Sequence, residues 1–177
     1  MSIMNRVGEI IPSEFSWKYR VDGEWVTRTT DDLFAGKKVI VFSLPGAFTP
    51  TCTNEQLPGF EAKYDEFRTA GLDQIYCASV NDAFVMNAWF KELGITKVQH
   101  IPDGNVQLTH WTDMSVNKAN LGFGCRSWRY VMYVNNMVVE NVWAEEGCMD
   151  NCSDDPYQIT TPESIYERVS PLLAGAG

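Results

Sequence analysis

A cysteine at the junction between an apolar run and a helical pattern is the residue of this chain best suited to chemistry. Cys52 follows the apolar run 39–42, which predicts a buried strand, and it precedes a segment with helical spacing. Backbone N–H groups and the helix dipole at such a junction favour a thiolate. Thr49 supplies a hydroxyl three residues earlier, and Pro45 and Pro50 stiffen the approach. From its position alone, Cys52 is either a reactive thiolate or an inert core cysteine.

The number of cysteines indicates free thiols rather than a disulfide framework. The five cysteines are spread along the chain, at Cys52, Cys77, Cys125, Cys148 and Cys152. Any fully paired scheme leaves one over, which fits a reactive-cysteine enzyme in a reducing compartment. Residues 1–14 lack the layout of a signal peptide, and no stretch reaches the ~18 apolar residues of a membrane span. We therefore expect a cytoplasmic protein with no membrane partner.

Composition limits the classes of function further. The 177 residues suit a single domain over 1–177, and the 45% hydrophobic content can fill a sizeable core. The net charge of −9, without a cluster of Lys and Arg, argues against nucleic-acid binding. The acidity mainly implies solubility.

The order of predicted elements indicates the fold class. A β-hairpin is expected over residues 15–28, with Asp22-Gly23 as its turn. Further strands are expected at 38–44, 74–80, 98–101, 129–134 and 137–144, and helices at 30–34, 53–70, 83–93, near Leu108 and at 161–173. This order predicts an α/β sandwich with a mixed central sheet flanked by helices.

Local signals refine these elements. Thr30-Asp31-Asp32 is expected to cap the first short helix, and Pro58 should kink or break the start of the next one. Asn135-Asn136 is expected to form the turn of the last hairpin. Residues 106–127 should hold a short helix and a glycine-broken loop, and residues 145–157 an acidic loop.

Several segments together resemble the type II, or five-type, peroxiredoxins. Residues 45–52, Pro-Gly-Ala-Phe-Thr-Pro-Thr-Cys, fit the family's active-site pattern Pro-x-x-x-Thr-x-x-Cys. Further matches are Val80-Asn81-Asp82-Ala83-Phe84-Val85-Met86-Asn87-Ala88-Trp89, Asp103-Gly104-Asn105 and Arg126-Ser127-Trp128-Arg129-Tyr130. The resemblance covers about residues 7–173 and implies a thioredoxin-like fold with an N-terminal β-hairpin extension. It also implies reduction of hydrogen peroxide and organic hydroperoxides by a cysteine, without metal, haem or flavin.

The resemblance also implies roles for individual residues. Cys52 is expected to be the peroxidatic cysteine, whose thiolate attacks the O–O bond and becomes a sulfenic acid. Thr49 is expected to hydrogen-bond the thiolate and the peroxide, and Pro45 to shield the sulfur from water. Arg129 is expected to stabilise the thiolate and the charge on the leaving oxygen. Arg126 competes for this role, but Arg129 directly precedes the aromatic and apolar strand, as the family's arginine does.

The way in which Cys52 returns to its reduced form stays open. Cys77 matches a second cysteine of many relatives, but it is expected in mid-strand, where bonding to Cys52 would need local unfolding. Cys148 and Cys152 lie in a loop, so either can be a resolving thiol, or they can pair with each other. Cys125 lies in a glycine-rich loop as a further accessible thiol. Without a resolving thiol, glutathione and glutaredoxin would reduce Cys52, which is the preferred interpretation. An internal disulfide reduced by thioredoxin is the alternative.

Other classes of function compete for the same residues. A disulfide oxidoreductase needs Cys-x-x-Cys at the strand-to-helix turn, and Thr53, Asn54 and Glu55 follow Cys52 instead. One cysteine pair with His100 and His110 makes a poor zinc ligand set. A redox-sensing or chaperone-like interaction protein remains an alternative. A homodimer is expected, with apolar residues of 83–86 and 122–124 available to a partner.

Overall fold

The computed structural model describes residues 6–175; residues 1–5, which begin the segment inspected for a signal peptide, and residues 176–177 lie outside it. A five-stranded sheet forms its centre. The strand order is β5 (Gln99–Pro102), β4 (Gln74–Ser79), β3 (Lys38–Ser43), β8 (Tyr130–Asn135) and β9 (Val138–Ala144). β3, β4 and β5 are parallel, whereas β8 runs antiparallel to β3 and β9. The predicted mixed sheet is therefore confirmed.

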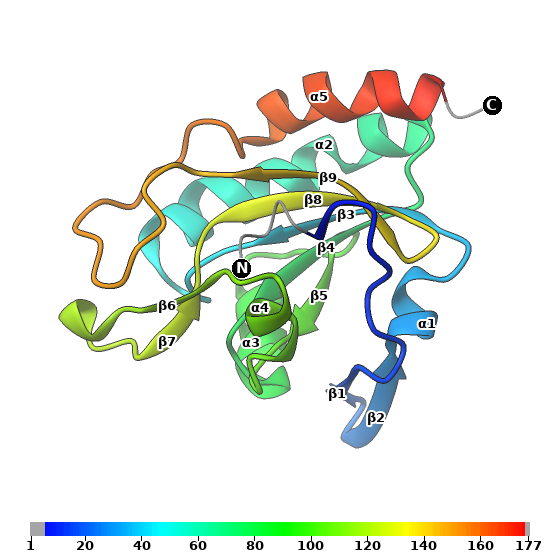
Figure 1. Cartoon of the computed structure of the whole chain (residues 1–177). Helices are drawn as coiled ribbons and strands as arrows, with labels where there is room; N and C mark the ends of the chain where they lie inside the picture. Colours follow the sequence, from blue (N-terminus) through cyan, green and yellow to red (C-terminus); the bar gives the residue numbers. More distant parts are fainter. Residues whose placement is uncertain (1–5, 176–177) are drawn as a thin grey trace.

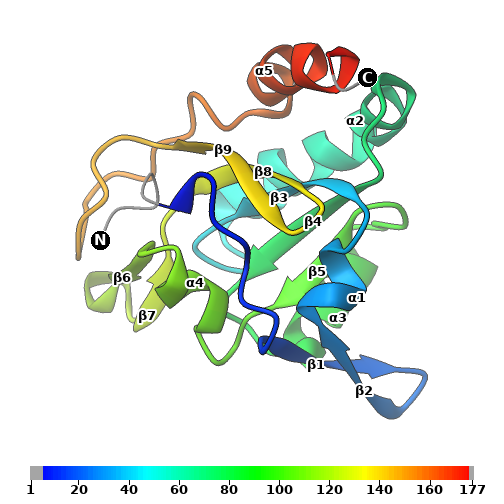
Figure 2. The ribbon, with the colours of Figure 1, turned by 45° about the vertical axis from the view of Figure 1, so that its right-hand side comes forward.

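Alternating residues of β3 build a core on each face of the sheet. Val39 and Val41 belong to one apolar cluster, and Ile40 and Phe42 to the other. Over the second cluster lie α2 (Leu57–Ala70), α3 (Ala83–Glu92) and α5 (Pro162–Ala174), and Figures 1 and 2 show α2 and α5 side by side. Over the first lie α1 (Thr30–Phe34), α4 (Gln107–Trp111) and the hairpin β1 (Ser16–Val21) and β2 (Glu24–Thr29).

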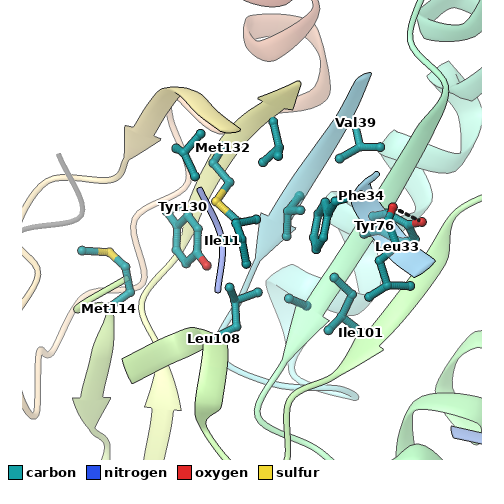
Figure 3. Close-up of a cluster of buried hydrophobic side chains, with 14 of the residues drawn as sticks. Ile11, Leu33, Phe34, Val39, Tyr76, Ile101, Leu108, Met114, Tyr130 and Met132 are labelled. Atoms are coloured by element: carbon teal, nitrogen blue, oxygen red, sulfur yellow. Dashed lines mark hydrogen bonds between the residues drawn. The ribbon is translucent and has the colours of Figure 1, made fainter. Parts of the chain in front are cut away.

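Tyr76 shows how the first cluster holds α1 against the sheet. Its hydroxyl donates to the Leu33 carbonyl at 2.8 Å, and its ring meets Phe34 edge to face (Figure 3). Burial raises the pKa of Tyr76 to about 12. The hydroxyl therefore stays protonated and serves as a donor.

Some predicted turns and caps are shifted by a residue. The hairpin around Asp22-Gly23 is confirmed. The cap of α1 is Thr29 rather than Thr30, in a reciprocal capping box with Asp32. The last hairpin turns at Asn136-Met137, both with positive φ, rather than at Asn135-Asn136, because β8 extends through Asn135.

The segment 106–127 contains more structure than predicted. It holds α4, but also a small hairpin of β6 (Ser115–Asn117) and β7 (Cys125–Ser127), with the 3-10 turn η3 (Ala119–Leu121) between them. Strands of three residues are too short for periodicity to reveal. Within residues 6–175, no helix is both long and apolar enough to cross a membrane.

Candidate active site

The loop after β3 leads into a helix whose first turns are irregular. Helical geometry begins at Pro50, widens to a π-turn over η2 (Cys52–Gln56), and continues as α2. In that turn the Leu57 N–H donates to the Cys52 carbonyl. Pro58, the next residue, has no N–H for the usual bond four residues back, which accounts for the irregularity. The break expected near Pro58 is thus present as a π-turn.

Cys52 lies in the first turn of this helix and is 1% exposed. Backbone N–H groups of a first turn lack partners within the helix and carry its partial positive charge. The Arg129 Nη1 atom lies 3.5 Å from the Cys52 Sγ atom and also donates to the Gln56 side-chain oxygen. A guanidinium therefore joins the helix start at the sulfur, in a site almost closed to water.

Arg129 is 1% exposed and is held on several sides. Its Nη2 atom lies 2.6 Å from Asp155 Oδ1, and its Nε atom donates to the Pro156 carbonyl at 3.2 Å. Burial disfavours the charge, but the Cys52 sulfur and Asp155 outweigh that effect and raise the pKa of Arg129. The guanidinium stays ionised, with a fixed orientation.

The loop between Glu145 and Thr160 supplies Asp155 and Pro156, and a buried carboxylate holds it in place. Glu145, 4% exposed, accepts hydrogen bonds from the backbone of three consecutive residues and from the Thr160 hydroxyl. The Glu145 N–H also donates to the Arg129 carbonyl at 3.1 Å. The sequence predicts only an acidic loop over residues 145–157, because contacts between residues this far apart in the chain leave no local pattern.

The segment beginning at Val80 positions the loop before Cys52. Asn81 Oδ1 accepts from the Ala47 N–H at 3.0 Å and from the Ser79 hydroxyl at 2.6 Å. Further along α3, Trp89 Nε1 donates to the Thr53 hydroxyl at 3.0 Å. The second matching segment of the sequence therefore braces both sides of the Cys52 turn.

Arg126 and Arg129 have different positions. Arg126 Nη1 donates to the Pro45 carbonyl at 3.1 Å, and no hydrogen bond within residues 6–175 joins it to the Cys52 sulfur. A Cβ atom on Gly46 would lie 2.2 Å from the same Nη1 atom, so glycine leaves room for this guanidinium. Burial lowers the pKa of Arg126. Arg126 thus braces the loop, whereas Arg129 touches the sulfur.

Thr49 is engaged with its own loop. Its hydroxyl donates to the Gly46 carbonyl at 2.7 Å, and its carbonyl accepts from the Thr53 N–H at 2.9 Å. Among the hydrogen bonds of the described chain, none joins this hydroxyl to the Cys52 sulfur. The expected bond from Thr49 to the thiolate would therefore require the hydroxyl to turn away from Gly46.

A cavity of about 320 Å³ opens beside this loop. Its walls include Pro45, Thr49, Lys118, Cys152 and Asp155. Two residues expected at the site thus face the same space as one of the candidate resolving cysteines. Cys152 is partly buried there.

The remaining cysteines lie in contrasting environments. Cys77 is fully buried in β4, within the same apolar cluster as Cys52. Burial first, and the nearby Cys52 second, raise the pKa of Cys77 well above its usual value. Cys125 and Cys148 are exposed, and all five thiols are free. Burial and the neighbouring Asp113 and Asp150 raise the pKa of Cys148.

Comparison with known proteins identifies the family. The Redoxin family model matches residues 7–148. Peroxiredoxin y4vD of Sinorhizobium fredii is 58% identical over 145 residues, which is 82% of this chain and 77% of that protein. The crystal structure of the Plasmodium falciparum antioxidant protein, a 1-Cys peroxiredoxin, has a TM-score of 0.88 and 35% identity, covering 93% of this chain and 98% of that one. Reduced Prx3 from Vibrio vulnificus in complex with hydrogen peroxide has a TM-score of 0.82 and 32% identity, covering 92% and 98%.

These similarities extend over nearly the whole sheet and confirm the thioredoxin-like fold. The chain belongs to the Redoxin family and is a peroxiredoxin, as the segments around Cys52, Asn81 and Arg129 predict.

Proposed function

We propose that this thiol peroxidase uses Cys52 as its peroxidatic cysteine and reduces hydrogen peroxide and organic hydroperoxides. The observation that carries the proposal is the contact between the buried Cys52 sulfur and the Arg129 guanidinium. The thiolate attacks one peroxide oxygen, the O–O bond breaks, and the sulfur becomes a sulfenic acid. The other oxygen leaves with the bonding pair and takes up a proton, giving water or an alcohol. A related Prx3 structure contains hydrogen peroxide, which supports this substrate.

Arg129 stabilises the negative charge in this reaction. The charge begins on the sulfur and moves to the leaving oxygen, and a fixed guanidinium can donate to both. Asp155 and the Pro156 carbonyl hold the guanidinium, so little reorganisation is needed. Pro45 and Thr49 line the adjoining cavity, where they shield the sulfur and offer a hydroxyl to the peroxide.

Glutathione is the reductant that we favour. A glutathione thiolate attacks the Cys52 sulfenic acid, releases water and forms a mixed disulfide, which glutaredoxin then reduces. Cys77 is a poor internal competitor because it is fully buried and burial raises its pKa. The similar Plasmodium falciparum protein is described as a 1-Cys peroxiredoxin, which supports reduction without a second cysteine.

Cys152 carries the alternative, an internal disulfide reduced by thioredoxin. It lines the cavity that adjoins Thr49 and Pro45, so loop movement could bring it to an oxidised Cys52. Cys148 is more exposed, and its raised pKa disfavours its thiolate. Cys152 is therefore the best-placed internal thiol.

One pair of experiments tests both halves of the cycle. Hydroperoxide consumption should be abolished in Cys52→Ser, and unchanged turnover would refute the peroxidatic assignment and favour a redox-sensing or chaperone-like role. The wild type is then treated with one equivalent of peroxide, with and without glutathione, and its disulfides are mapped by mass spectrometry. A Cys52–glutathione adduct is expected, whereas a Cys52–Cys152 bond would favour thioredoxin.

The same proposal includes a homodimer in the cytoplasm. Phe84 at the start of α3 is 55% exposed and Phe48 in the Cys52 loop 52% exposed, so apolar surface is available near the site. Ala83 and Met86 are buried and do not contribute. Five free thiols suit a reducing compartment.

A further inference from the structure

The cavity beside the Cys52 loop has two charged wall residues that the proposed peroxide chemistry does not use. Besides Pro45 and Thr49, its lining includes Lys118 and Asp154. Its volume of about 320 Å³ lies within the range of roughly 300–1,000 Å³ typical of small-molecule sites. Hydrogen peroxide fills only a fraction of this space, so the cavity has room for a larger ligand.

Lys118 is a buried cation whose charge the protein does not neutralise. The residue is 3% exposed, and its ammonium group lies 5.7 Å from the centroid of the Trp128 ring. Among the residues that the structure describes, no carboxylate lies within 4.0 Å of this ammonium group. Burial of a charge without a counter-charge is costly, and a cation–π contact offsets only part of that cost. Lys118 therefore lacks an anion.

The ammonium group of Lys118 keeps a narrow contact with solvent. Three side-chain polar atoms of the described chain are fully enclosed and have no hydrogen-bond partner, namely His100 Nδ1 and the hydroxyls of Tyr130 and Tyr133. The Lys118 ammonium is not one of them, although no acceptor in the described chain takes a hydrogen bond from it. Because Lys118 lines the cavity, a ligand there can supply the missing anion.

Asp154 supplies the opposite charge. It is exposed, and no cation of the described residues lies within ion-pair distance of it. Asp155 also lines the cavity, but Arg129 neutralises it at 2.6 Å. Leu121 and Phe123 add apolar surface to the wall. One free ammonium and one free carboxylate on a partly apolar wall are the complement of a zwitterion that carries a carboxylate, an ammonium group and a short carbon chain.

The cavity adjoins the sulfur that has to be reduced. Thr51, directly before Cys52, lines it, and so does Asp155, which the Arg129 guanidinium joins to the Cys52 sulfur. Because Cys52 is 1% exposed, a reductant has to approach from an adjoining hollow. Cys152 lines the same cavity, so a ligand bound there would also keep this internal thiol away from Cys52.

We propose that this cavity is a docking site for glutathione, in which Lys118 binds a carboxylate and Asp154 the α-ammonium group of the γ-glutamyl residue. The inference deepens the proposed function and rests on it. The docked thiolate attacks the sulfur of the Cys52 sulfenic acid, an S–S bond forms and the S–O bond breaks. Hydroxide leaves with the bonding pair and takes up the proton that the glutathione thiol released, giving water.

Calorimetric titration of the reduced full-length protein with S-methylglutathione tests binding without chemistry, because the methyl group blocks the thiol. The diethyl ester of the same compound, which lacks both carboxylate charges, is the matched control. S-methylglutathione should bind at least tenfold more tightly than the ester, the usual effect of losing one charged hydrogen bond. Equal affinities, or no binding of either compound, would overturn the site. Failure of the peroxidase assignment would appear elsewhere, as a Cys52 that hydrogen peroxide does not oxidise.

The rate of glutathionylation provides a second test. The protein is oxidised with one equivalent of hydrogen peroxide, and formation of the Cys52–glutathione disulfide is followed by mass spectrometry. The rate should level off as the glutathione concentration rises, because the docking site fills. With 2-mercaptoethanol, which has no charged group to dock, the rate should rise in proportion to concentration. A proportional rise with glutathione would refute docking and leave the peroxidase assignment intact.

Charge variants show whether the binding uses this cavity. Lys118→Met and Asp154→Asn should each weaken the binding of S-methylglutathione about tenfold. Lys91→Met removes the same charge as Lys118→Met from an exposed position outside the cavity and should not change the affinity. Unchanged affinity in either cavity variant, or equal weakening by Lys91→Met, would refute the proposal. Asp154 is exposed, so its variant tests the site even if Lys118→Met unfolds.

Discussion

Arg129 is the residue on which the contacts of the active site converge. One guanidinium reaches the Cys52 sulfur, the Gln56 side chain, Asp155 and the Pro156 carbonyl. Only a planar group with several donors can make these contacts together. A lysine would keep the charge, but its single ammonium group could not donate to all of these acceptors at once.

Arg129→Lys should therefore lower the rate constant for peroxide reduction by about a hundredfold, as loss of an oriented charge at a reacting centre generally does. The measurement is stopped-flow consumption of hydrogen peroxide. The matched control is Arg126→Lys, which alters the brace on Pro45 but not the contact with sulfur. A larger loss in the Arg126 variant would reverse the roles assigned to the two arginines.

Cys77 provides a second prediction at this scale. Because burial raises its pKa and removes it from solvent, iodoacetamide should modify it at least a hundredfold more slowly than the exposed Cys125 at pH 8. Peptide mass spectrometry over time gives both rates. In denaturant the two rates should become similar. Comparable rates in the native protein would show that β4 opens easily and would restore Cys77 as a resolving thiol.

The loop from Glu145 to Thr160 is the element that connects the sheet to the active-site arginine. Glu145 begins it beside Arg129, and one buried carboxylate gathers the backbone N–H groups of three residues. Asp155 and Pro156, within the same loop, then reach Arg129. An irregular segment thus obtains a fixed shape from a single side chain.

Glu145→Gln should destabilise the protein by about 1–3 kcal/mol, because an amide nitrogen replaces one acceptor facing buried donors. Peroxidase activity should fall as well, since the loop holds Arg129. Urea unfolding and peroxide consumption measure the two effects. Glu146→Gln, at the exposed neighbouring position, is the control and should change neither. Lost stability with full activity would show that the loop does not orient Arg129.

Prediction from the sequence succeeded where the signal is local and failed where contacts are distant. The strands around Val41 and Met132 are continuous apolar runs, so their existence and order were predictable. The resemblance of residues 126–130 to the family's segment also pointed to Arg129, the arginine that contacts Cys52. In contrast, Gln56, Glu145 and Asp155 are separated from their partners by loops, and no periodicity marks such contacts. The turn at Asn136-Met137 was missed because methionine seldom adopts positive φ.

At the scale of the whole molecule, two exposed aromatic side chains, Phe48 and Phe84, lie in the segments that form and brace the Cys52 loop. Phe84 is the second residue of α3. Asp82 caps this helix, and Asn81 braces the Cys52 loop. Phe48 lies in that loop with φ of 65° and contacts Trp89 of α3. Two copies that covered these rings would also cover the braces of the reactive cysteine. Assembly and reactivity would then be connected.

Phe84→Asp should convert the proposed homodimer to monomers at micromolar concentration. In a two-fold interface the substitution occurs twice, so the dimer loses two buried rings and gains two buried charges. The dissociation constant should therefore rise at least a hundredfold, which corresponds to a loss of about 3 kcal/mol in the free energy of dimerisation. Sedimentation velocity measures the mass of the wild type and the variant. Leu172→Asp, on the exposed side of α5, is the matched control and should remain dimeric. A monomeric wild type would exclude the homodimer, and a Phe84 variant that stays dimeric would place the interface elsewhere. Either result would refute the proposed connection between dimerisation and the Cys52 loop.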